Sequence, residues 1–129
     1  MSYLDLTQQL SKIAKEYREA ANAYKEERAN HAEATNKLTS LIYKTGLYKD
    51  KASFENKLAK LLATSEADKA HYYLEMLNTS EANYKGWKMV CKALGAEISA
   101  IQSVIKFNLT GELNENIANK AQVDSLMLI

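Results

Sequence analysis

The chain has 129 residues, 17 basic and 16 acidic side chains, and a formal net charge of +1. This length suits one small domain, and the balanced charge gives no electrostatic reason to expect a nucleic acid or a membrane surface as partner. The sequence has no proline and only 4 glycines, too few for the turns of an all-β or loop-rich protein. Its single cysteine, Cys91, excludes an internal disulfide and a cysteine-rich zinc site.

Targeting and membrane segments are not expected. The first thirty residues contain acidic side chains and no continuous apolar run, so no signal peptide is visible. No stretch approaches the roughly 18 apolar residues of a membrane span. We therefore expect no membrane partner.

Hydrophobic periodicity predicts a first helix over residues 3–44. Apolar residues recur at alternating steps of four and three, which places them on one helix face, and a strict seven-residue repeat favours a coiled coil. Gly46 suits the left-handed position just past a helix end. The positions of this seam are Leu6, Leu10, Ile13, Tyr17, Ala20, Tyr24, Glu27, His31, Ala34, Leu38 and Leu41.

A second helix is predicted over 50–63, with Asp50 as its N-cap and Phe54 and Leu58 on one face. Ser65 followed by Asp68 resembles a capping box, which favours a break before the next helix. A single continuous helix would also keep the apolar residues on one face, so the sequence leaves both arrangements open.

A third helix is predicted over 66–108. Its most apolar stretch would overhang the first helix if the second and third helices were continuous, and would then lack a partner within the chain. We therefore predict a homo-oligomer, most simply a two-fold dimer. The residues expected to mediate self-association are Leu94, Ile98, Ile101 and Ile105.

The sequence thus predicts an all-α fold: an elongated antiparallel helical hairpin or coiled coil, oligomeric, in a domain over 1–109. Thr110-Gly111 reads as a helix stop, followed by a tail over 110–129 that could form a short docking helix. The apolar end of this tail, 126–129, would dock on the chain's own seam or contact a partner.

Glu27 and His31 are polar residues at seam positions. In a hairpin closing near residue 47, they would face Asp68 and His71, and these four side chains could bind a metal. A di-iron bundle needs two Glu-x-x-His pairs, which are absent from the sequence. We interpret Glu27 and His31 as a polar layer that fixes register, and expect no enzyme activity, no cofactor and no metal.

Basic residues beside aromatic ones give an alternative function, because lysines with stacking aromatics bind single-stranded nucleic acid. Tyr43 and Tyr48 lie close in sequence to Lys49 and Lys51. Tyr84 and Trp87 lie close to Lys85, Lys88 and Lys92, although we expect both of these aromatic side chains to be buried. A solvated helix face explains the same lysines. The residues for nucleic-acid contact are Lys49, Lys51, Lys85, Lys88 and Lys92.

The stretches YKDKASFENKLAKLLA (48–63) and KALGAEISAIQSVIKF (92–107) give the chain a recognisable character. It resembles small, proline-poor helical proteins encoded in bacteriophage early regions. The resemblance implies a bacterial intracellular setting and two ways of acting by binding. The first is a protein-binding adaptor or inhibitor directed at a host protein, and the second is an accessory factor in phage DNA recombination or replication.

Overall fold

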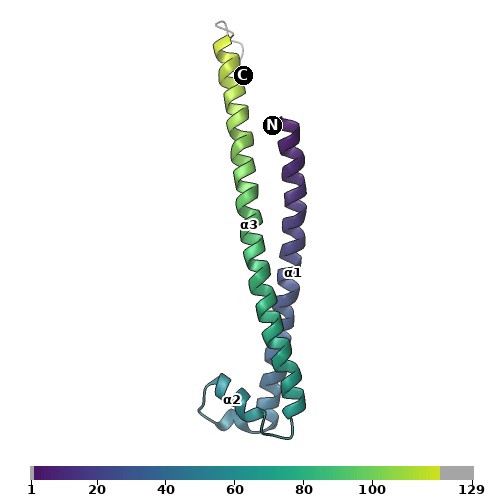
Figure 1. Cartoon of the computed structure of the whole chain (residues 1–129). Coiled ribbons are helices and arrows are strands. Elements are labelled where there is room, and N and C mark those ends of the chain that lie inside the picture. Colours follow the sequence, from purple (N-terminus) through teal and green to yellow (C-terminus); the bar gives the residue numbers. More distant parts are fainter. Residues whose placement is uncertain (1, 120–129) are drawn as a thin grey trace. The chain divides into compact units, whose positions relative to one another are not determined.

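A computed structural model describes the backbone of residues 2–119 and the side chains of residues 2–109 (Figure 1). The chain forms α1 (Tyr3–Lys44), a 3-10 turn η1 (Leu47–Lys49), α2 (Phe54–Leu61) and α3 (Ala67–Asn119). No strand occurs between residues 2 and 119. The prediction of an all-α fold is therefore confirmed.

Helix α1 has the bounds that the periodicity predicted. It ends before Gly46, whose φ of 78° lies in the left-handed region that glycine adopts at low cost. The amide of Gly46 donates to the carbonyl of Tyr43 at 3.1 Å, and the Thr45 amide donates to Leu41 at 3.0 Å. These bonds close the last turn of α1.

Helix α2 is shorter than predicted, and its cap is a different residue. Ser53 is the N-cap, and its hydroxyl oxygen accepts a hydrogen bond from the Asn56 amide at 3.3 Å. Asp50, the predicted cap, instead accepts a bond from the Ala52 amide at 3.0 Å and pairs with Lys60. Because these partners hold its carboxylate in the connection before α2, the Asp50 prediction was wrong.

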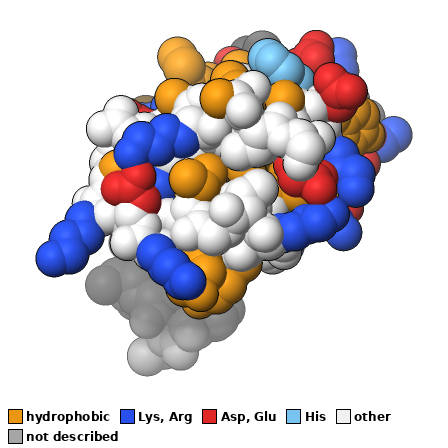
Figure 2. All heavy atoms as spheres, turned by 90° about the horizontal axis from the view of Figure 1, so that it is seen from below, with side chains coloured by type: hydrophobic (Ala, Val, Ile, Leu, Met, Phe, Trp, Pro, Cys, Tyr) orange, Lys and Arg blue, Asp and Glu red, His pale blue; other side chains and the backbone are white. Residues whose placement is uncertain are grey.

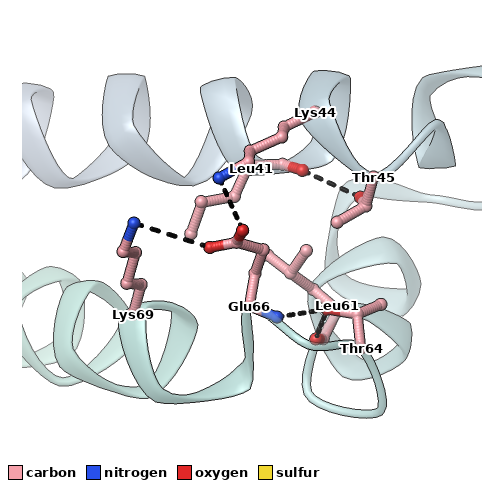
Figure 3. A network of polar contacts seen from close by, with 7 residues as sticks. All are labelled: Leu41, Lys44, Thr45, Leu61, Thr64, Glu66 and Lys69. Carbon is pink, nitrogen blue, oxygen red and sulfur yellow. Dashed lines mark hydrogen bonds and ion pairs between the residues drawn. The ribbon is translucent and has the colours of Figure 1, made fainter.

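The predicted break between the second and third helices is confirmed, but the Ser65 capping box is not found. Thr64 makes the turn: its hydroxyl donates to the Leu61 carbonyl at 2.6 Å and accepts from the Glu66 amide at 3.2 Å (Figure 3). Glu66 then pairs with Lys44 at 2.6 Å. This pair joins the end of α1 to the start of α3.

Helix α3 continues through Asn119, so the predicted stop at Thr110-Gly111 was wrong. A glycine inside a helix costs only about 1 kcal/mol relative to alanine, which does not force an end. The rest of the predicted tail, 120–129, lies outside the described residues. The side chains of residues 110–119 also lie outside the described residues.

The chain divides into two compact units. We call residues 20–89 the α2 unit, and residues 2–19 with 90–119 the terminal unit. In the α2 unit, all three helices supply the core, and the side chains of Leu38 and Leu61 are fully buried. Lys44 meets Glu66 and Glu27 meets Asn83, so the α1 and α3 segments of this unit run antiparallel. The buried cluster comprises Leu38, Leu41, Ile42, Leu58, Leu61 and Ala70.

The terminal unit pairs the start of α1 with the later part of α3. Leu6 and Ile13 are buried, and a Cβ atom at Gly95 would lie 3.7 Å from the Tyr17 ring. The predicted self-association residues, which are Leu94, Ile98, Ile101 and Ile105, are all half-buried in this unit. The overhang of this stretch was expected only if the second and third helices were continuous; the chain breaks before α3, and α1 residues share the unit of this stretch. Their self-association stays a prediction.

Candidate functional site

An open apolar groove lies between α2 and α3 in the α2 unit. Its volume is about 460 Å³, within the range of ligand-binding clefts. The Ser53 cap fixes the start of α2, and Leu58 and Leu61 anchor the helix on the core. The groove is lined by Phe54, Glu55, Leu58, Ala59, Leu62, Leu74, Leu77, Asn78 and Glu81.

The groove floor is leucine-rich. Leu62, Leu74 and Leu77 pack against the core cluster but remain only partly buried. Phe54, the first residue of α2, has 40% of its surface exposed and also lines the groove. Side chains of this kind usually turn inward. A groove lined mainly by apolar side chains with a few polar groups is typical of a ligand-binding cleft.

The polar lining of the groove is acidic. Glu55 comes from α2 and Glu81 from α3, and the third polar lining residue is the neutral Asn78. Glu81 pairs with Lys85 at 2.9 Å, and the hydrogen bond from Lys85 lowers the pKa of the Glu81 carboxyl. Glu81 is therefore an anion at neutral pH. The arrangement can take up apolar groups together with a neighbouring positive charge.

The predicted polar layer has different partners from those expected. Glu27 accepts a hydrogen bond from the Asn83 side chain at 3.3 Å, and the His31 ring lies edge-on to Tyr84 with 5.3 Å between centroids. Asp68 and His71, the expected partners, are exposed. The connection between α1 and α3 explains the difference. Because α2 and its flanking turns separate Lys44 from Glu66, the residues opposite Glu27 and His31 lie further along α3 than expected.

Tyr84 is the centre of this contact region. The Tyr24 ring lies edge-on to it at 6.1 Å, and the Arg28 guanidinium carbon lies 4.8 Å from its centroid. A cation over an aromatic face is stabilising. Residues 2–109 contain no group of three or more histidine, cysteine or acidic side chains placed to hold a metal ion.

The lysines predicted to contact nucleic acid are not all alike. Lys85 pairs with Glu81, whereas Lys49, Lys51 and Lys88 in the α2 unit and Lys92 in the terminal unit are exposed. Viewed from the end that carries α2, lysine and arginine side chains are spread around the rim among acidic and apolar ones (Figure 2). Basic charge is therefore not concentrated in one patch on this face.

The aromatic residues near these lysines also differ. Tyr43 and Tyr48 stack at 4.7 Å with 13° between their planes, are 65% and 45% exposed, and have the Lys49 ammonium 5.7 Å from the Tyr48 ring. In the second group, Tyr84 is half-buried. Trp87 is 39% exposed, so the expectation of its burial was wrong.

Sequence reasoning missed the groove. The signal was the width of the apolar face at the start of α3, where Leu74 lies beside the seam residues Tyr73 and Leu77. A helix that packs through a single heptad seam needs an apolar residue at only one of two adjacent positions, such as 73 and 74. The additional leucine indicates a second apolar contact, and in the structure it lines the groove beside α2.

No family model, curated protein or solved structure is significantly similar to this chain. Within residues 2–119, none of the helices combines the length and the apolar character required to cross a membrane.

Proposed function

We propose that this protein is a non-enzymatic helical adaptor or inhibitor that binds an apolar segment of another protein in the groove between α2 and α3. The observation that carries the proposal is the groove itself, formed by leucines that the chain leaves partly uncovered. Insertion of an amphipathic helix into a groove is a recurring mode of protein recognition. Burial of apolar surface favours such binding, and only the part that exceeds the cost of association and ordering appears as affinity.

The groove is suited to binding because it is built before a partner arrives. The N-cap at Ser53 and the buried side chains of Leu58 and Leu61 hold α2 in place. A preformed site avoids the cost of ordering a flexible one. In this proposal the chain is an elongated coiled-coil hairpin that self-associates in the bacterial cytoplasm, with a host protein as target of a phage-encoded product.

Filling the groove tests the proposal. Ala59 is exposed and lines the groove, so Ala59→Trp should block it without disturbing the core. Ala32 is exposed on α1 and lies outside the groove lining, so Ala32→Trp is the matched control. Tagged wild-type and variant proteins would be purified from the native host. A protein retained by wild type and by Ala32→Trp, but lost with Ala59→Trp, supports groove binding. Equal retention by all three contradicts it.

A second candidate function is binding of single-stranded nucleic acid at the exposed stack of Tyr43 and Tyr48. The observation that favours it is an exposed pair of stacked tyrosine rings with the Lys49 ammonium beside it. Base stacking on tyrosine and phosphate contacts by lysine together produce salt-dependent binding.

Fluorescence titration with single- and double-stranded oligonucleotides at two salt concentrations tests this second function. Tyr43→Ala with Tyr48→Ala should abolish binding, whereas Tyr72→Ala, at a site that is 66% exposed on α3, should not change it. Lysine contacts require the affinity to fall steeply with salt. Absence of binding at low salt would remove the nucleic-acid function.

A further inference from the structure

The charge of the groove indicates which kind of segment it accepts. Its two carboxylates come from different helices, Glu55 from α2 and Glu81 from α3, and none of the lining residues is a cation. Glu81 retains 41% side-chain exposure in its pair with Lys85, so its carboxylate is open to a further partner. A segment entering the groove therefore meets leucines below, the Glu55 carboxylate on α2, and on α3 the Glu81 carboxylate, which already pairs with Lys85.

Resting on the proposed function, we propose that the occupant is an amphipathic helix of a partner protein with lysine or arginine on both sides of its apolar face. The apolar side chains contact Leu62, Leu74 and Leu77, and the basic side chains pair with Glu55 and Glu81. Residues three and four apart on the partner helix lie on one face, so basic residues flanking such a face reach outward to both helices.

Other occupants fit the lining less well. An acidic helix would place like charges beside Glu55 and Glu81, which lowers affinity and selects against that partner. A purely apolar helix would cover the Glu55 carboxylate without supplying a counter-charge. A basic amphipathic helix supplies apolar side chains for the leucines of the groove and positive charges for its carboxylates.

The size of the charge preference can be bounded. Exposed ion pairs contribute about 0.2–1 kcal/mol each, so two pairs correspond to a preference of roughly two- to thirtyfold at low salt. Salt screens such pairs, whose interaction decays over about 10 Å at 0.1 M ionic strength. The apolar contribution to binding does not decline in this way.

Two labelled helical peptides of about 18 residues test the proposal by fluorescence anisotropy with the full chain. They carry the same leucine face, flanked by lysines in one and by glutamates in the other. We expect the basic peptide to bind about tenfold more tightly at low salt, with a smaller difference at high salt. Glu55→Gln with Glu81→Gln should remove this preference. Glu26→Gln with Glu33→Gln, at two exposed sites on α1, should keep it.

The outcomes separate the inference from the function beneath it. Equal binding of both peptides, blocked by Ala59→Trp, leaves the groove as a binding site and overturns the charge preference. A preference that persists after Glu55→Gln with Glu81→Gln also overturns it, because the charge would then be read elsewhere. Binding of neither peptide at any salt concentration overturns groove binding itself.

Discussion

Truncation of Leu61 tests whether α2 is firmly held to the rest of its unit, a condition for a preformed groove. Leu61 is the last residue of α2, is fully buried, and belongs to the same core cluster as Leu38. Leu61→Ala removes three carbon atoms, a transfer term of roughly 2.4 kcal/mol at 0.8 kcal/mol for each. The cavity left behind adds to this. We therefore expect a loss of about 3 kcal/mol in the free energy of unfolding.

Urea unfolding followed by circular dichroism measures this loss. Leu38→Ala should have a similar effect, because Leu38 is also fully buried. Leu4→Ala is the matched control: 63% of Leu4 is exposed, so the change should stay within about 0.5 kcal/mol. A loss below about 1 kcal/mol for Leu61→Ala, with the full loss for Leu38→Ala, would show that α2 is not docked.

Three further predictions concern the turns that place α2. Gly46→Ala should destabilise the protein by about 1–2 kcal/mol in urea unfolding, because the φ of Gly46 is 78°. No atom lies within 4 Å of the added Cβ atom, so this loss should come from the backbone alone. Asparagine tolerates the left-handed conformation better than alanine, so an equal loss in Gly46→Asn would contradict this origin. Ser53→Ala should cost about 1 kcal/mol in the same assay, and Ser53→Asp, which keeps a capping oxygen, should cost less. The hydrogen bond from Lys44 lowers the pKa of the Glu66 carboxyl from its ordinary 4.5, so its contribution to stability is present above pH 4.5 and is lost as the pH falls through the lowered folded-state value. Lys44→Met should remove most of this acid-side dependence in a pH series of unfolding curves.

The helices were predictable where a local rule determines them. The bounds of α1 follow from a seven-residue repeat and from one glycine that adopts a left-handed conformation. The end of α3 did not follow from Gly111, because the helix continues past it. A glycine marks an end only when the chain turns there, and the turn depends on what the helix packs against.

The partners of Glu27 and His31 could not be read from the sequence. Periodicity assigned Glu27 and His31 to the inner face of α1, where both are half-buried. It contained no information on how many residues the connection uses before α3 begins. The capped helix α2 takes up much of that connection, and the residue opposite Glu27 becomes Asn83 instead of Asp68. The register of two packed helices depends on the length of the connection between them as well as on their apolar faces.

The same turn explains why a groove exists. A continuous helix from residue 54 onward would present Leu58, Leu62 and Leu77 as one seam against α1, with no second wall. The Thr64 turn instead folds α2 back beside α3, and the pair between Lys44 and Glu66 fixes the start of α3 (Figure 3). Packing alone needs only the buried face of α2. Its remaining apolar residues, together with Leu74, line a groove that leaves part of their surface in water. Leaving that surface uncovered forgoes the stability that its burial would supply, and in the proposed function a segment of a partner protein covers it.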